Sequence, residues 1–116
     1  MNGNQPRKRE KILSGRTTRY KTGCGWVYIT VNRDKEGLFE IFAHLGKSGQ
    51  CGAAQLEAIC RSVTAGLRAY VDPKVFIKQF KGIKCPSPSL DEGIQILSCA
   101  DAIATAIELE TKEATK

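Results

Sequence analysis

Five cysteines are the residues of this 116-residue chain whose type and surroundings could support chemistry. Cys60 lies inside an apolar run, where a free thiol behaves as a small hydrophobic side chain. The other four stand beside glycine, proline or serine, at positions where regular elements are expected to begin or end. Glycine lets the backbone approach a shared point closely, and zinc takes four thiolates in a closed structural site. The candidate zinc ligands are therefore Cys24, Cys51, Cys85 and Cys99.

The spacing of these four cysteines gives the zinc interpretation little support. Ligand pairs of structural zinc sites usually lie about two to four residues apart. The nearest pair here, Cys85 and Cys99, is fourteen positions apart. The alternative is that two or three of the four are buried packing thiols. A further interpretation concerns Cys51 and Cys99, because a thiol at a helix N-terminus has a lowered pKa and is more nucleophilic.

Other patterns of catalytic or binding residues are incomplete in this sequence. His44 is the only histidine and no Gly-x-Ser-x-Gly motif occurs, which excludes a catalytic triad and leaves His44 as a side chain on a strand face. Thiol exchange is disfavoured because no Cys-x-x-Cys pair is present. Gly46-Lys47-Ser48 lacks the earlier glycine of a phosphate-binding loop. The amides of residues 48–52 could dock an anion before a helix, although a plain turn is the simpler explanation.

Positive charge is concentrated near the N-terminus. The net charge is +6, and residues 7–21 contain seven lysines and arginines against one acid, Glu10. Residues 1–16 lack apolar periodicity, so we expect a flexible tail whose deletion leaves the fold intact. Such a tail suits an acidic partner, either nucleic acid or the acidic face of a protein, and the alternative is a solvated arm. The candidate contact residues are Arg7, Lys8, Arg9, Arg16, Arg19, Lys21 and Lys47.

The length predicts one domain, and the hydropathy pattern predicts a cytoplasmic protein. A chain of this size can bury a modest core without disulfides. No apolar run reaches the ~20 residues that span a bilayer, and the N-terminus leads into no secretory signal. We therefore expect no membrane partner and thiols that are kept reduced.

Apolar periodicity predicts an α+β fold, in which a small antiparallel sheet is packed by two to three helices. The alternating residues 26–32 and the β-rich residues 38–45 form a hairpin, and residues 16–21 add an edge strand. After the polar loop 89–93, residues 94–97 form a short strand. The sheet is thus expected in the N-terminal half of the domain.

The helices are predicted from apolar spacing and from capping residues. One helix follows the glycine-rich segment 46–52, Asp72-Pro73 begins a second, and Ser98 caps a third. The inward side of the third carries Ala102, Ile103, Ala106 and Ile107. The expected divisions of the chain are a basic tail at 1–16, a domain at 17–110 and a frayed end at 111–116.

Several motifs of this sequence resemble those of a known domain family, in the same order, from about residue 12 to residue 110. They are Lys21-Thr22-Gly23-Cys24-Gly25, Phe39-Glu40-Ile41-Phe42-Ala43, Leu45-Gly46-Lys47-Ser48-Gly49, Val71-Asp72-Pro73, Lys84-Cys85-Pro86-Ser87-Pro88 and Leu97-Ser98-Cys99-Ala100-Asp101. The chain resembles the TSCPD domain, which closes the C-terminal end of many adenosylcobalamin-dependent (class II) ribonucleotide reductases. The Thr-Ser-Cys-Pro-Asp motif of that domain keeps its serine, thiol and acid here but loses its proline at Ala100.

The resemblance implies an accessory or C-terminal module of vitamin B12-dependent ribonucleotide reductase (ribonucleoside-diphosphate reductase), which supports deoxyribonucleotide and DNA precursor synthesis. Its partner would be the catalytic polypeptide of the reductase, with nucleic acid as a second candidate. The reductase holds its radical cysteine, reducing thiols, cobalamin and nucleotide in a barrel of several hundred residues, which this chain cannot contain. We therefore expect no catalytic residues and no cobalamin binding in this chain, whether it is free-standing or a fragment. The alternative function is a free-standing nucleic-acid-binding or regulatory protein with the same fold.

Overall fold

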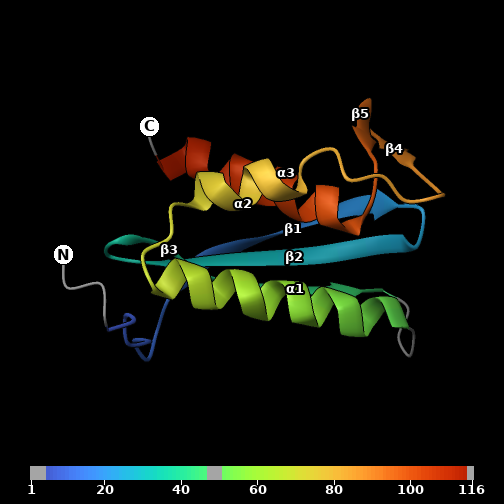
Figure 1. The fold of residues 1–116 in the computed structure, drawn as a ribbon. Coiled ribbons are helices and arrows are strands. Elements are labelled where there is room, and N and C mark those ends of the chain that lie inside the picture. The colour runs from blue at the N-terminus through green and yellow to red at the C-terminus, as the bar shows by residue number, and fades with distance from the viewer. Residues whose placement is uncertain (1–4, 47–50, 115–116) are drawn as a thin grey trace.

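Three long antiparallel strands form the sheet on which the helices pack (Figure 1). The computed structural model describes residues 5–46 and 51–114. The strands are β1 (Ser14–Thr22), β2 (Gly25–Asp34) and β3 (Gly37–Leu45), and they lie in the order β1-β2-β3. The predicted hairpin and the predicted edge strand are both confirmed.

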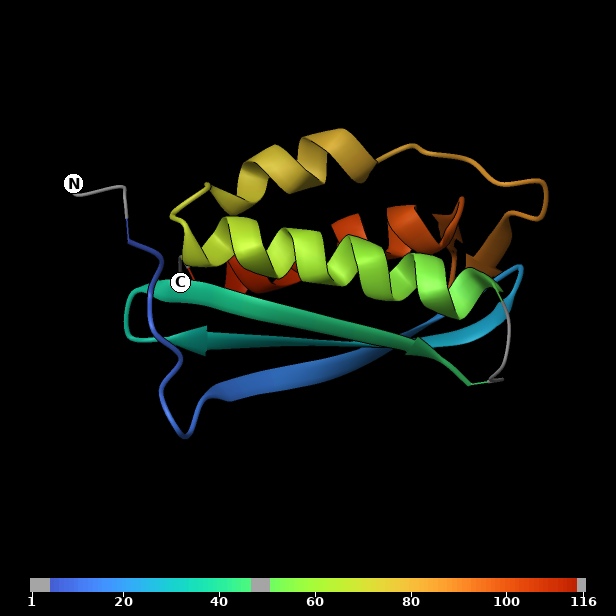
Figure 2. The ribbon, with the colours of Figure 1, turned by 60° about the horizontal axis from the view of Figure 1, so that its bottom comes forward.

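In the part of the chain that the structure describes, the helices lie on one side of this sheet (Figure 2). Helix α1 (Cys51–Arg68) packs along β3, and α2 (Pro73–Phe80) packs against α3 (Cys99–Ala114). The predicted fold class, a small antiparallel sheet with helices in a single α+β domain, is therefore confirmed. Across residues 5–46 and 51–114, no helix is both long and apolar enough to cross a membrane.

A second sheet consists of the short strands β4 (Ser89–Asp91) and β5 (Ile94–Ile96). The sequence predicted β5 but a loop in place of β4. Glu92 and Gly93 between them have φ values of 51° and 85°, as a two-residue type I′ turn requires. Glutamate rarely adopts a positive φ, so the sequence lacked the usual signal for this hairpin. Helix α3 also continues to Ala114, beyond the expected start of fraying at residue 111.

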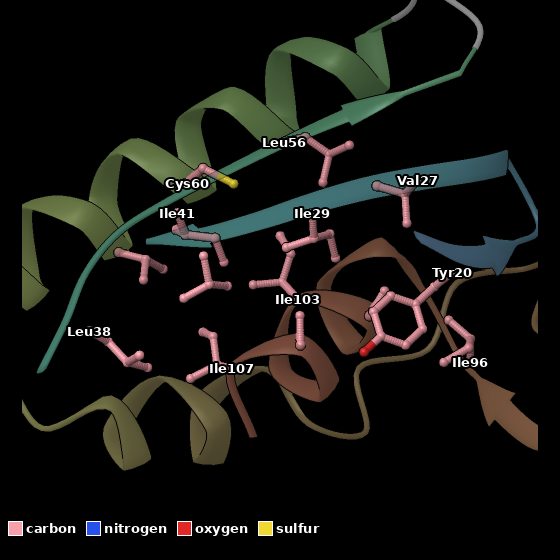
Figure 3. Packing of buried hydrophobic residues seen from close by; sticks show 14 of the residues in the cluster. Tyr20, Val27, Ile29, Leu38, Ile41, Leu56, Cys60, Ile96, Ile103 and Ile107 are labelled. Carbon is pink, nitrogen blue, oxygen red and sulfur yellow. The ribbon is translucent and has the colours of Figure 1, made fainter. Parts of the chain in front are cut away.

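The hydrophobic core fills the space between the sheet and the helices (Figure 3). Alternate side chains of β2 face it, and α3 contributes the four residues predicted for its inward side, all of them buried. Cys60 on α1 is also buried in this cluster, which confirms its interpretation as a packing thiol. The largest buried side chains include Ile29, Ile41, Leu56, Ile96, Ile103 and Ile107.

Capping residues set the boundaries of α2 as the sequence predicts. The Asp72 carboxylate accepts a hydrogen bond from the backbone N–H of Lys74 at 3.0 Å, and Pro73 occupies the first helical position. The helix ends shortly before Gly82, whose φ is 88°. The chain then turns away toward the segment that contains Cys85.

The N-terminal segment is packed against the domain through Arg7. The guanidinium of this buried side chain forms an ion pair with Asp34 at 2.8 Å and donates to the carbonyl oxygen of Leu38 at 2.6 Å. The backbone N–H of Arg7 donates to the carbonyl oxygen of Arg68 at 2.9 Å. Strand β1 begins at Ser14, so part of the sheet also lies within the predicted tail at 1–16. Deleting residues 1–16 therefore removes part of the folded domain, contrary to our expectation.

Candidate functional site

Three of the four candidate zinc ligands come together near the turn that joins β1 to β2. Cys24 lies in that turn, Cys85 lies between α2 and β4, and Cys99 is the first residue of α3 (Figure 1). The thiols of Cys24 and Cys85 are close enough to affect the ionisation of Cys99. We refer to these three residues as the cysteine cluster.

The hydroxyl of Thr22 shapes the turn that carries Cys24. It donates to the carbonyl oxygen of Gly25 at 2.7 Å and accepts from the backbone N–H of Cys24 at 3.1 Å. The Cys99 thiol donates weakly to the same oxygen, with an S–O distance of 3.9 Å. This buried threonine therefore ties the β1–β2 turn to the first residue of α3.

Gly23 allows the same turn to lie directly against the segment that carries Cys85. A Cβ atom at Gly23 would lie 1.9 Å from the carbonyl oxygen of Ser87 and 2.4 Å from its Cβ. The backbone N–H of Ser87 points back to Cys85 and donates to its Sγ at 3.4 Å. The glycine beside Cys24 thus provides the close backbone approach that the sequence predicts.

Ser98 fixes the start of α3 and the course of the preceding segment. Its Oγ accepts from the backbone N–H of Asp101 at 3.0 Å, which confirms the predicted helix cap. The same hydroxyl donates to the carbonyl oxygen of Ile83 at 2.6 Å. Two residues further along, the N–H of Cys85 donates to the carbonyl oxygen of Leu97 at 2.9 Å. Cys85 is thereby held beside the residue that precedes the α3 cap.

Asp101 joins the same two segments from the other side. Its carboxylate accepts hydrogen bonds from the backbone N–H groups of Gly82 and Leu97, each at 3.0 Å. The side chain is buried, so these bonds to a charged acceptor are among the stronger contacts of this region. The serine and the acid of the Leu97–Asp101 motif therefore position Cys85 and Cys99.

The ionisation of the thiols is controlled mainly by burial. Burial raises the pKa of Cys99, and the neighbouring Cys24 and Cys85 raise it further, while the hydrogen bond to Thr22 acts in the opposite direction. The expectation of a lowered pKa at the start of α3 is therefore wrong for Cys99, because burial outweighs the helix dipole. Burial also raises the pKa of Cys60 to about 11.

The described residues do not by themselves form a metal cage. No group of three or more His, Cys, Asp or Glu side chains in this part of the chain is arranged to hold a metal ion. The fourth candidate, Cys51, is the first residue of α1, and its side chain lies outside the described residues. The start of α1 lies at the same end of the molecule as the β1–β2 turn (Figure 1). A zinc site formed by all four cysteines thus stays a prediction.

The candidate cationic contacts fall into two groups. Arg7, Arg9 and Arg16 form ion pairs with the buried carboxylates of Asp34, Glu40 and Glu110. Lys8, Arg19 and Lys21 are exposed, and the guanidinium of Arg19 lies 4.1 Å from the ring centroid of Trp26. Lys47 and most of the proposed anion-docking loop at 48–52 lie outside the described residues.

Sequence reasoning missed Thr22 and Ser87 as supports of the cysteine cluster. The Thr22 hydroxyl accepts a hydrogen bond from the backbone N–H of Cys24, two residues further along the chain. Ser87 lies directly against Gly23, in a turn more than sixty residues earlier in the sequence. The run Thr22-Gly23-Cys24-Gly25 contained the signal for the first, since a threonine hydroxyl often bonds to the backbone two residues on. The contact of Ser87 had no local signal.

This arrangement defines a small α+β domain in which turns and capping residues bring thiols together. The profile of one domain family matches residues 4–111, almost the whole chain, and that family is the TSCPD domain. The chain belongs to the TSCPD domain family, and this domain is found in class II ribonucleotide reductases. A search of the curated proteins found no match, and neither did a search of the solved structures.

Proposed function

We propose that this chain is an accessory module of an adenosylcobalamin-dependent ribonucleotide reductase and that it stabilises the catalytic polypeptide. The observation that carries the proposal is membership of the TSCPD family over residues 4–111. The buried contacts of Ser98 and Asp101 agree with it, because they give the family's motif a role in shaping the domain. The product that this assembly supports is deoxyribonucleotide for DNA synthesis.

The proposal includes a structural zinc site with Cys24, Cys51, Cys85 and Cys99 as ligands. It is supported by the convergence of three of these thiols from separate elements and by the start of α1 at the same end of the molecule. Zinc bound there would supply no catalysis, and its contribution would be to hold the β1–β2 turn, the Cys85 segment and two helix starts together. The docking surface for the reductase would then lie on a rigid part of the domain.

The same proposal gives the chain no turnover of its own. Ribonucleotide reduction needs a thiyl radical, a nearby pair of reducing thiols and a radical-generating cofactor in a shielded site. Cys60 is buried in the core, where the pKa of its thiol is raised to about 11, and the sequence contains no Cys-x-x-Cys pair of reducing thiols. The module is therefore expected to act by association.

The test uses a class II reductase that has been truncated of its own C-terminal domain. Adding the 116-residue chain should raise the thermal midpoint of the truncated enzyme and restore deoxyribonucleotide formation. Cys85→Ser should fail in this assay, whereas Cys60→Ala, which alters a thiol outside the cluster, should retain the effect. Failure of the wild-type chain to associate with any class II reductase would contradict the proposal, as would deoxyribonucleotide formation by the chain alone.

A further inference from the structure

The side of the three-stranded sheet that faces away from the helices carries aromatic and basic side chains. In the described part of the chain, all helices lie on the opposite side (Figure 2). Because side chains alternate along a strand, the neighbours of the buried Val27 and Ile29 on β2 point to this open side. An open sheet side usually carries polar residues, so aromatic rings in this position need an explanation.

The strand register places these side chains in adjacent rows. Lys21 lies opposite Trp26, and Arg19 lies opposite Tyr28, which in turn lies opposite His44. In the next row, Thr30 lies opposite both Thr17 and Phe42. We call this surface the aromatic face and define it by Arg19, Lys21, Trp26, Tyr28, Phe42 and His44.

The rings of the aromatic face are organised and accessible. Tyr28 and His44 stack with their centroids 5.5 Å apart and their planes 16° apart. The guanidinium carbon of Arg19 lies over Trp26 at 4.1 Å from the ring centroid, which is a cation–π contact. Phe42 is 52% exposed, as its place on the open side of β3 requires. The face thus presents aromatic surface on β2 and β3 to solvent, beside two cations on β1.

Charge on this face favours an anionic ligand. Arg19 and Lys21 are both exposed on β1. Among the described residues that strand alternation places on this side of the three strands, the acids are Asp34 and Glu40, which lie at the far end with their side chains buried in ion pairs with Arg7 and Arg9. Burial alone would raise the pKa of the Glu40 carboxylate, but hydrogen bonds from Arg9 and Asn32 lower it below its ordinary value. Asp91 of β4, whose carboxylate accepts a hydrogen bond from the backbone N–H of Lys21 at 2.9 Å, brings one negative charge to the β1 edge of this face, against the two positive charges of Arg19 and Lys21.

We propose that the aromatic face binds single-stranded nucleic acid. Exposed bases would stack on Phe42 and on the Tyr28–His44 pair, and Arg19 and Lys21 would contact backbone phosphates. Stacking needs bases that are not already paired and stacked in a duplex, and it tolerates any sequence because every base has a π face. This binding is separate from the proposed association with a reductase and involves none of the cysteines.

The test measures fluorescence anisotropy of labelled oligothymidylate and oligouridylate with the full chain, and it uses a duplex of equal length for comparison. Both single strands should bind and the duplex should bind much more weakly. Phe42→Leu and Tyr28→Leu keep apolar bulk but remove a ring, so each should weaken binding by about tenfold. Leu90→Ala, which alters an exposed apolar side chain on β4, should leave the affinity unchanged.

A charge series separates a specific site from general attraction. Arg19→Gln should reduce the slope of log affinity against log salt by about 0.7, as expected for one phosphate contact on a single strand. Lys35→Gln removes the same charge from the exposed β2–β3 turn and should leave the slope nearly unchanged. The thermal midpoint of each variant, measured by circular dichroism, checks that the fold is retained.

Four results would overturn the inference. They are no binding of either oligonucleotide at low salt, equal affinity for duplex and single strand, equal effects of Arg19→Gln and Lys35→Gln, and full affinity after loss of the rings in folded variants. If the ring variants instead lose association with a reductase while oligonucleotides never bind, the aromatic face is a protein-docking surface. The reductase assay scores the accessory function independently of the oligonucleotide result.

Discussion

Replacing Asp101 by alanine should loosen the connection between the Cys85 segment and the start of α3. The buried carboxylate accepts two hydrogen bonds, from the N–H groups of Gly82 and Leu97. A hydrogen bond to a charged group contributes about 1.5 to 3 kcal/mol to stability, and a buried donor that loses its partner costs about 1 to 3 kcal/mol. Gly82 is exposed, so its N–H can bond to water after the substitution. Loss of the hydrogen bond from Gly82 should therefore cost less than loss of the hydrogen bond from Leu97.

The expected loss for Asp101→Ala is therefore about 2 to 4 kcal/mol, a large share of the ~5–15 kcal/mol of a typical domain. Asp101→Asn keeps one acceptor oxygen and should lose about half as much. Urea unfolding followed by circular dichroism measures both values. Asp72→Ala is the matched control, because this exposed carboxylate caps α2 through a single bond and should cost about 1 kcal/mol.

A second readout follows the geometry of the cysteine cluster. In Asp101→Ala, Cys85 and Cys99 should react faster with a thiol reagent, because the segment between Gly82 and Cys85 is held at the start of α3 by fewer hydrogen bonds. Equal unfolding free energies for Asp101→Ala and Asp72→Ala, together with unchanged thiol reactivity, would refute the role given to Asp101.

Three further predictions concern the turn at Gly23, the N-terminal segment and the core thiol. Gly23→Ala should destabilise the domain, because the new Cβ would lie 1.9 Å from the carbonyl oxygen of Ser87. Gly52→Ala is the control and should be neutral or slightly stabilising, because its Cβ would have its nearest contact at 3.5 Å. Thermal melts of the two variants test this, and equal midpoints would contradict the close approach at Gly23. Arg7→Ala should lower the free energy of unfolding by about 3 to 5 kcal/mol, because it leaves the Asp34 carboxylate buried without its ion-pair partner. Lys8→Ala alters the exposed neighbouring residue and should leave the free energy of unfolding, measured with urea, unchanged. Burial raises the pKa of the Cys60 thiol from 9.0 to about 11. The contribution of this thiol to stability is therefore complete below pH 9 and is lost as the pH rises toward 11. The unfolding free energy of Cys60→Ala should fall less steeply with alkaline pH than that of the wild type, and parallel pH profiles would contradict this.

The sequence predicted those parts of the fold that depend on local signals. The alternation in residues 26–32 predicts a strand and Asp72-Pro73 predicts the start of a helix, and the structure confirms both. Arg7 was assigned to a tail because it stands in a run of like charges, while its actual partners, Asp34 and the carbonyl oxygen of Leu38, are about thirty positions away. Contacts of that range leave no local pattern in the sequence.

The environment of the candidate site could be predicted from the sequence only in part, and the assignment of its residues stays a prediction. The glycine beside Cys24 correctly indicated a close backbone approach, since Ser87 fills the space that a side chain would occupy. The pKa of Cys99 was predicted in the wrong direction, because burial, which depends on tertiary packing, raises it and the neighbouring thiols raise it further. The aromatic face was not predicted, because it becomes visible only when the register places side chains of three strands side by side.

The metal content of the purified 116-residue chain tests the proposed structural site most directly. Elemental analysis should find one zinc ion per chain in the wild type and in Cys60→Ala, and no zinc in Cys85→Ser. A chelator should lower the thermal midpoint of the first two proteins, because metal binding and folding are coupled at a structural site. A metal-free wild-type protein whose thermal midpoint does not respond to added zinc or to chelator would contradict the assignment of Cys24, Cys51, Cys85 and Cys99 as ligands.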